Sequence, residues 1–340
     1  MIEVNGGIRI AVPSDGAMHD PTLSFLEGCG LGVDRGNSRR YIASIPSLDG
    51  ATILFQRSSD ITSKVEDGSA DLGILGYDRF LEMRREDGSS AVVMNGLGFG
   101  GCALVVGVPD SWVDVVTMAD LADVAMEFRD EGKYLRIATK SPRLVERFLV
   151  SSGINYFSLV QSSGTLEASP AMGFADIIVD ITSSGNTMRE NRLKTLRGGT
   201  VIKSEACLIG NVGSIKASSS KQNLSRAFVD TIAAHLQSKD YYTVTANING
   251  DDPSEVSRRL LEQTELVGLR GPTIAKVYAG GNENWYALTL VIQRSQLMNA
   301  VNKLRDIGGT SVTVSQPSYV FQTGSDMIAP FLGDYTFAYF

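Results

Sequence analysis

Short apolar runs alternate with amphipathic segments through the first two hundred residues of the chain. The runs have the length and composition of buried strands, and they occupy residues 8–12, 52–56, 72–76, 91–98, 103–108, 134–139, 176–181 and 205–210. Between several of them apolar residues recur at helical spacing, in residues 60–68, 117–128 and 141–153. Strands that alternate with helices indicate an α/β fold with mainly parallel sheets, covered by helices on both faces.

The pattern changes after residue 217. A serine-rich linker leads into one amphipathic helix at 217–240, and the segments that follow predict strand, helix, strand, strand, helix and strand. They occupy residues 241–248, 252–264, 273–279, 285–293, 295–309 and 310–321. This βαββαβ order is typical of a ferredoxin-like module of about 80 residues. The tail at 327–340 carries several aromatic residues, so we expect it to pack or to form part of an interface.

Composition narrows the class of protein. A length of 340 residues predicts two or three domains, and 43% hydrophobic with 20% charged residues indicates a globular chain. A net charge of −7 without a basic stripe argues against nucleic-acid binding, and no apolar run is long enough to cross a membrane. Three widely spaced cysteines and no evident signal peptide lead us to expect a reducing, cytoplasmic location. Two histidines and no CxxC pair leave little material for a protein-bound metal site.

One stretch carries a candidate binding chemistry. An apolar run ends in Asp180, and six small or polar residues follow in "TSSGNT" at 182–187. Phosphates are held by main-chain N–H groups at loops and helix starts, and small side chains let the main chain approach. A carboxylate at the end of the strand can accept hydrogen bonds from two ribose hydroxyls. Taken alone, these residues are explained slightly better by an ordinary polar turn with a serine N-cap.

The surroundings of this loop resemble the phosphoribosyl-diphosphate-binding region of ATP phosphoribosyltransferase, the first enzyme of histidine biosynthesis. The matching positions are Glu167, Ala168, Pro170, Gly173, Ala175, Asp176, Asp180, Gly185, Thr187, Asn191 and Leu193. A second stretch, "FQRSSDITSKVEDGSADLGILGYDRFLE" at 55–82, is similar to another motif of the family. Its matches are Arg57, Asp60, Ile61, Val65, Gly68, Asp71, Gly73, Gly76 and Asp78. The resemblance covers nearly the whole chain, and the C-terminal module resembles the regulatory domain of the long form.

The resemblance implies two lobes like those of periplasmic binding proteins, with a catalytic cleft between them, and a C-terminal ferredoxin-like (ACT-like) domain. The first lobe would comprise residues 1–105 and 190–220, and the second residues 106–189 with the phosphoribosyl-diphosphate loop. The regulatory domain would span 225–322 and the tail 323–340. The implied reaction transfers the 5-phosphoribosyl group of phosphoribosyl diphosphate to N1 of ATP and releases diphosphate. Mg²⁺ would ride on the substrate phosphates, histidine would inhibit, and the chain would form a homo-oligomer between a dimer and a hexamer.

The site residues carry over by motif position. No covalent catalytic residue and no protein-held metal are implied. The expected contacts of phosphoribosyl diphosphate are Glu167, Asp180, Thr182, Ser183, Ser184, Gly185, Asn186 and Thr187. The expected residues on the ATP side are Ser14, Arg57, Asp71, Gly73, Asp78 and Lys140. Each has a structural alternative: Asp71 and Asp78, for example, suit helix or turn caps equally well.

The chain departs from the family at the end of its first strand. The family usually places a lysine and an arginine there, whereas this chain has Asp15 and Ala17. Either Arg35, Arg39 or Arg40 supplies the missing charge, or ATP is held differently. A weakened or non-catalytic paralogue acting as a small-molecule sensor or regulatory subunit is the alternative function. A periplasmic-type binding protein would share the two lobes but should carry an export signal.

Overall fold

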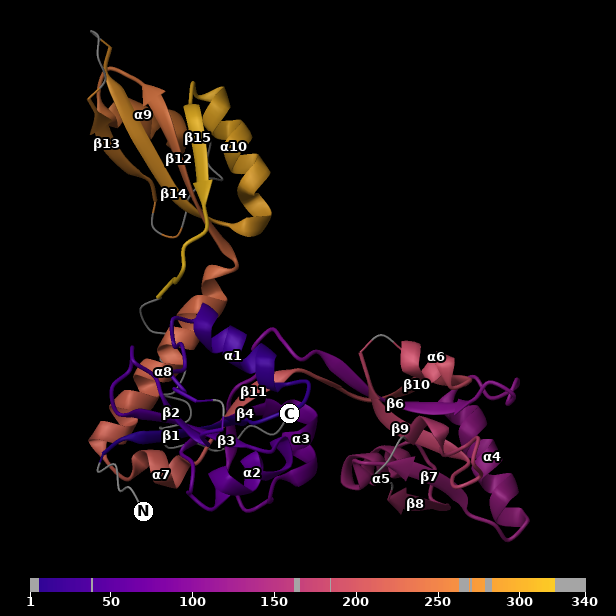
Figure 1. The fold of residues 1–340 in the computed structure, drawn as a ribbon. Helices are drawn as coiled ribbons and strands as arrows, with labels where there is room; N and C mark the ends of the chain where they lie inside the picture. Colours follow the sequence, from indigo (N-terminus) through magenta and orange to yellow (C-terminus); the bar gives the residue numbers. More distant parts are fainter. Residues whose placement is uncertain are drawn as a thin grey trace. The chain divides into compact units, whose positions relative to one another are not determined.

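The computed structural model describes residues 6–37, 39–161, 166–183, 185–262, 269, 271–278 and 283–321 (Figure 1). The described chain forms two compact units, and the division falls between Arg226 and Ala227. The expectation for the aromatic tail concerns residues outside the described part of the chain. No helix among the described residues is long and apolar enough to cross a membrane.

The first unit begins with a six-stranded sheet in the order β2-β3-β1-β4-β11-β5. Its strands are β1 (Ile8–Pro13), β2 (Ile42–Ser44), β3 (Ala51–Gln56), β4 (Leu72–Gly76), β5 (Ala91–Met94) and β11 (Ala206–Gly210). Helices α1 (His19–Gly28), α2 (Ser58–Glu66), α3 (Tyr77–Met83) and α7 (Val212–Lys216) accompany it. The central strands β1 and β4 are almost fully buried, which is why their sequences read as continuous apolar runs.

A second, five-stranded sheet completes the first unit, in the order β10-β6-β9-β7-β8. Its strands are β6 (Cys102–Pro109), β7 (Leu135–Thr139), β8 (Phe157–Gln161), β9 (Ile177–Thr182) and β10 (Leu193–Ser204). The accompanying helices are α4 (Met118–Asp130), α5 (Pro142–Ser151), the short 3₁₀ turn η1 (Leu166–Ala168) and α6 (Asn186–Glu190). The two sheets are the centres of the two predicted lobes.

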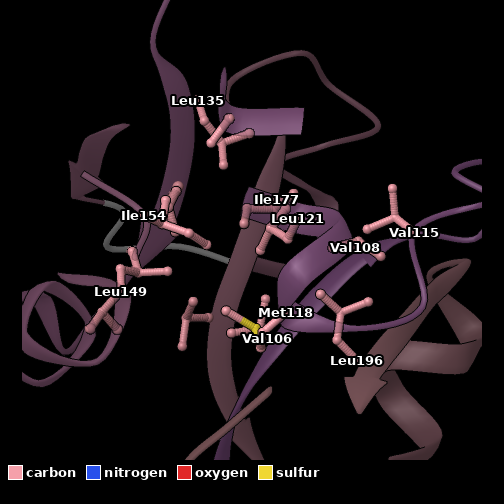
Figure 2. Packing of buried hydrophobic residues seen from close by; sticks show 14 of the residues in the cluster. Val106, Val108, Val115, Met118, Leu121, Leu135, Leu149, Ile154, Ile177 and Leu196 are labelled. Carbon is pink, nitrogen blue, oxygen red and sulfur yellow. The ribbon is translucent and has the colours of Figure 1, made fainter. Parts of the chain in front are cut away.

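The second lobe has its own hydrophobic core. Figure 2 shows Met118 and Leu121 of α4 packed toward Val106 and Ile177 of the sheet. A capping box starts α4, because the Thr117 side chain accepts from the Asp120 amide while the Asp120 carboxylate accepts from the Thr117 amide. The cap fixes where the helix begins, and hence which of its faces meets the sheet.

Both sheets are mixed, whereas the sequence led us to expect mainly parallel ones. Pairings β1–β3, β1–β4, β7–β8 and β7–β9 are parallel, and the remaining pairings in these two sheets are antiparallel. Apart from β2–β3, every antiparallel pair in these sheets involves β6, β10 or β11, the segments by which the chain leaves one sheet and enters the other. Residues 190–220 were expected in the first lobe, but β10 pairs with β6 of the second sheet over most of its length.

Helix α8 (Ser219–Ser238) continues into the second unit. There the chain forms β12 (Tyr241–Asn249), α9 (Pro253–Leu261), β13 (Thr273–Val277), β14 (Trp285–Gln293), the 3₁₀ turn η2 (Arg294–Gln296), α10 (Leu297–Asp306) and β15 (Thr310–Ser315). The predicted βαββαβ order is observed. The sheet order is β13-β14-β12-β15 with antiparallel neighbours, and apolar residues on one sheet face pack with α9 and α10.

Candidate active site

The loop after β9 begins at the end of a buried strand. Ile177, Ile178 and Val179 are fully buried, and Asp180 is half-buried where the strand approaches its carboxyl end. Gly185 has a φ of 74°, a left-handed conformation that suits glycine, and it precedes α6. Its amide donates to Thr182 Oγ1 at 2.8 Å. That donor is therefore used within the loop and is not offered to a ligand in this conformation.

This loop borders a cavity of about 600 Å³ that residues of both lobes line. Lining residues include Thr182, Ser183 and Gly185 from the loop, Tyr77 from the first lobe, and Lys203 and Glu205 from the connection between the sheets. Asn186 and Thr187 follow at the start of α6 and are exposed. Ser184 lies outside the described residues. The loop thus reaches a hollow that is large enough for a small phosphorylated ligand.

Four charged side chains interact electrostatically around the end of β9. Burial is the main cause that raises the pKa of Asp180, and the nearby Glu167 carboxylate raises it further. The Ile181 amide, which donates to Asp180 Oδ1 at 2.8 Å, and the cations Lys140 and Arg79 act in the opposite direction. Lys140 directly follows β7 and Glu167 lies in η1, so three expected residues come together here. Arg79 belongs to α3 of the first lobe and was not anticipated from the sequence.

The carboxylates near this loop suit a divalent cation that arrives with phosphate oxygens. Asp180 and Glu167 repel each other electrostatically, and a cation between them would relieve that repulsion. Among the described residues no group of three or more His, Cys, Asp or Glu side chains is arranged to hold a metal. Mg²⁺ commonly uses one or two carboxylates and takes its other ligands from substrate and water, so these residues fit it.

The first lobe offers Ser14 and Arg57 at the carboxyl edge of its sheet. Parallel pairing aligns Pro13 with Gln56, and the Ser14 amide donates to the Gln56 carbonyl at 2.7 Å, so Ser14 and Arg57 follow neighbouring strand ends. Arg57 is exposed at the start of α2. Ligands of α/β sheets bind beyond the carboxyl ends of strands, which is where these residues lie.

Asp71 and Gly73 have structural roles in this geometry. Asp71 precedes β4, at the amino end of the strand, and is fully buried. Its carboxylate accepts from the Arg9 amide at 2.7 Å, from Lys221 Nζ at 2.5 Å and from the Ser214 hydroxyl. Gly73 lies against α2, where an added Cβ would come within 2.7 Å of Ile61. Neither residue faces the edge at which ligands bind.

Asp78 is buried as well, but at the carboxyl end of β4. Ser204 at the end of β10 donates to Asp78 Oδ1 at 2.6 Å and accepts from the Asp78 amide at 2.9 Å. Ser204 also lines the cavity, whereas Asp78 does not, so Asp78 holds a lining residue in place through these two hydrogen bonds. The second oxygen, Asp78 Oδ2, is buried and has no hydrogen-bond partner among the described residues.

The loop after β1 carries neither of the two basic residues that the family resemblance led us to look for. Asp15 and Ala17 are exposed. The guanidinium of Arg35 lies 3.8 Å from the ring centroid of Phe55, the residue paired with Val12, and Arg35 Nε donates to the Arg40 carbonyl at 2.6 Å. An arginine-bearing loop is thus fixed beside the ends of β1 and β3.

Comparison with known proteins identifies the family. A family model described as ATP phosphoribosyltransferase matches residues 57–238, and the model of the C-terminal domain of that family matches residues 238–316. The chain belongs to the ATP phosphoribosyltransferase family. The two matches follow one another along the chain, so the sequence resemblance to the long form is confirmed.

Relatives in this family align over most of the chain. ATP phosphoribosyltransferase 1, chloroplastic, of Arabidopsis thaliana is 36% identical over 320 residues, covering 92% of this chain and 77% of its own. The ATP phosphoribosyltransferase of Bradyrhizobium sp. is 33% identical over 328 residues, 96% of this chain and 98% of its own. That of Mesorhizobium japonicum is 43% identical over 207 residues, 60% of this chain and 89% of its own.

A solved structure of the family supports the two-lobed fold. A chain of the ATP phosphoribosyl transferase (HisG:HisZ) complex of Thermotoga maritima covers 66% of this chain and 96% of its own, with a TM-score of 0.51 and 22% identity. At that identity the likeness concerns the fold alone.

Several residues that line the cavity were missed by the sequence analysis. Tyr77, Lys203 and Glu205 flank strand ends, as the expected residues do, but no family motif singled out their side chains. Their common feature is position. They lie where β4 meets β11 and where β10 leads into β11, and the Tyr77 amide donates to the Glu205 carbonyl at 2.9 Å. Recognising them requires knowing that these segments connect the lobes.

Proposed function

We propose that this chain transfers the 5-phosphoribosyl group of phosphoribosyl diphosphate to N1 of ATP and releases diphosphate, the first step of histidine biosynthesis. The main support is the loop after β9, whose hydroxyls and glycine border a cavity that the first lobe also lines. A cavity between two lobes suits a reaction that must hold two polyanionic substrates in line. Membership of the family supplies the reaction class.

In this proposal the donor binds to the second lobe. The hydroxyls and remaining amides of Thr182, Ser183 and Thr187 hold its 5-phosphate, together with Ser184 and Asn186. Asp180 accepts from the ribose hydroxyls, and Glu167 faces the cation or the ribose. Lys140 and Arg79 balance the charge of the departing diphosphate. Mg²⁺ bound to the diphosphate would supply further charge neutralisation.

ATP binds to the first lobe in the same proposal. Ser14 and Arg57 at the strand ends contact the nucleotide, and Arg35 with its loop supplies the charge absent at residues 15 and 17. Adenine N1 is itself the nucleophile, so no side chain has to form a covalent intermediate. Holding N1 in line with C1 of the donor, away from competing water, is the main task of the protein.

Turnover by the purified chain tests the proposal. The full-length protein is incubated with ATP, phosphoribosyl diphosphate and Mg²⁺, and phosphoribosyl-ATP and diphosphate are measured by ion-exchange chromatography. We expect both products in equal amounts, and their loss when EDTA is present in excess. If neither product forms while both substrates bind, the chain is a non-catalytic relative, which is the alternative that Asp15 and Ala17 raised.

We further propose that histidine inhibits through the C-terminal domain and that the chain forms a homo-oligomer. The match to the family's C-terminal domain over residues 238–316 supports the first point. Histidine is expected to lower the turnover of the full chain and to leave a chain ending near residue 225 unaffected. Equal inhibition of both proteins would place the effector site elsewhere. Light scattering with and without histidine measures the oligomeric state.

A further inference from the structure

A carboxylate of the first lobe caps a helix of the second lobe. The first amides of a helix have no partner within it, and Ser141, the N-cap residue of α5, makes no side-chain cap bond. Glu82 of α3 fills that role, since its two oxygens accept from the amides of Arg143 and Leu144, each at 3.0 Å. Glu82 is only 9% exposed. A negative charge at the N-terminus of a helix also interacts favourably with the helix dipole.

A second, exposed contact lies beside this cap. Glu86 Oε1 accepts from Arg143 Nη2 at 2.6 Å and from Arg147, and Arg143 also donates to the Arg84 carbonyl. Hydrogen bonds from the two arginines lower the pKa of Glu86 to about 2. Exposed ion pairs of this kind contribute little individually, so the buried cap is the stronger part of the contact.

The two helices joined in this way both lead to the candidate active site. Helix α3 begins at Tyr77, which lines the cavity, and carries Arg79, which interacts electrostatically with Asp180. Helix α5 follows Lys140, whose charge also acts on Asp180. Neither Glu82 nor the α5 residues that it binds is among the residues that line the cavity. The contact therefore joins the lobes and leaves the cavity open.

We propose that Glu82 is a positioning residue that holds the lobes in the arrangement in which Arg79 and Lys140 both reach the donor site. The inference rests on the proposed function for the identity of the ligand, but the contact itself does not. When a binding-competent arrangement is only partly populated, the apparent affinity of a ligand that needs it falls by that fraction. A ligand held by one lobe alone is unaffected by that population.

Comparing E82Q with E86Q tests the proposal. Both changes replace one carboxylate with an amide of the same shape, and only the first is a buried cap. In E82Q the amide retains one acceptor for two donors and loses its charge. We expect the KM for phosphoribosyl diphosphate to rise about tenfold, a loss of about 1.4 kcal/mol, while kcat stays within about threefold. In E86Q both constants should stay within about twofold.

Two further readouts separate positioning from a general loss of structure. Amide hydrogen exchange at Arg143 and Leu144 should accelerate in E82Q and remain slow in E86Q. The Kd of ribose 5-phosphate, a probe that the donor loop alone can hold, should change less than about twofold in both variants. E82D retains the charge with a shorter reach and should be intermediate, which keeps the test informative if E82Q folds poorly.

The outcomes distinguish this inference from the proposed function. Wild-type protein that makes no product contradicts the function, while the exchange experiment still tests the cap. A normal KM in E82Q, or slow exchange at Arg143 and Leu144 despite the substitution, contradicts the positioning role. A similar rise in the Kd of ribose 5-phosphate would mean that the second lobe itself is damaged, and would overturn the inference as well.

Discussion

Asp71 offers a direct test of structural against ligand-binding roles, because the sequence grouped it with the ATP side and the structure buries it. Asp71→Asn keeps the shape of the side chain but removes its charge. The ion pair with Lys221 Nζ at 2.5 Å is lost, and the amide group must then face an ammonium or a main-chain N–H. Lys221 remains 18% exposed and can partly regain water.

The expected cost follows from these partners. Breaking a fully buried ion pair by removing one member costs about 3–5 kcal/mol, and each hydrogen bond to a charged group contributes about 1.5–3 kcal/mol. Partial rehydration of Lys221 lowers the first figure. We therefore expect Asp71→Asn to reduce the free energy of unfolding by about 2–4 kcal/mol. The KM for ATP of the folded variant should stay within about twofold of the wild type.

Urea unfolding followed by circular dichroism measures the first quantity, and steady-state kinetics at low temperature measures the second. Asp67→Asn is the matched control: Asp67 is exposed and its carboxylate accepts from the Ser69 amide at 2.8 Å. That change should cost less than about 1 kcal/mol. An Asp71→Asn protein as stable as the control, with a KM for ATP raised tenfold or more, would refute the structural role and return Asp71 to the site.

Three other predictions concern the loop and the lobe contact. Asp180→Asn should lower kcat/KM about 100-fold. The free energy of unfolding at pH 7 should stay equal or rise, because a pKa raised by folding means that the charged Asp180 carboxylate destabilises the folded state at pH values above it. Lower stability with full activity would contradict this. Gly185→Ala places a Cβ in open space but at a φ of 74°, where an alanine is strained. Thermal melts should show a loss of about 1 kcal/mol in the free energy of unfolding, and steady-state kinetics should show a higher KM for the donor. The Glu86 carboxylate should titrate with a midpoint of about 2 when followed by NMR. The stability that it contributes is therefore fully present above the pKa of Glu86 in the unfolded chain, and it is lost as the pH falls toward 2. A midpoint near 4.5 would show that the arginine contacts do not form in solution.

Much of the fold could be predicted because local signals and burial agree. Apolar runs identified β1, β3 and β4, and the run at 285–293 coincides with β14. The helical segments predicted from residues 141 and 252 begin within one residue of α5 and α9. Pro253 is the first residue of α9, and Gly153 after α5 has a φ of 78°, as suits a residue just beyond a helix. In each case the residues of one short stretch are enough to explain why the strand or helix forms there.

The missed strands lack such a local reason. The sequence of β10, "LKTLRGGTVIKS", alternates irregularly, because the strand lies at the edge of its sheet and shifts register near two glycines. Strands β2 and β8 are short edge strands. An edge strand buries little apolar surface, so its pairing depends on a distant partner that a local pattern does not reveal. The mixed strand directions of the two sheets escaped prediction for the same reason, because the direction of pairing also depends on a partner strand that is distant in the sequence.

Asp71 and Asp180 differ in where they lie relative to their strands. Both are acidic residues beside buried strands in family motifs, and both were expected to contact a substrate. Asp71 precedes β4, however, whereas Asp180 lies near the carboxyl end of β9. Ligands of parallel sheets bind at carboxyl ends, so position relative to the strand separates a structural aspartate from a candidate ligand.

Local cations must bring polyanionic substrates to this chain. Its net charge of −7 repels them at long range, but salt screens such repulsion beyond about 10 Å, so groups near the cavity decide binding. Where the family resemblance led us to look for two basic residues after the first strand, this chain has Asp15 and Ala17. Arg79 enters instead from α3, and Arg35 is fixed against Phe55 beside the same strand ends. Because Arg79 belongs to the helix that carries Glu82, the charge that acts on Asp180 from the first lobe and the buried cap between the lobes both come from one short element, α3. Family motifs predict where the donor loop lies, whereas the source of charge around it follows from the packing of this particular chain and stays a prediction until a donor complex is examined.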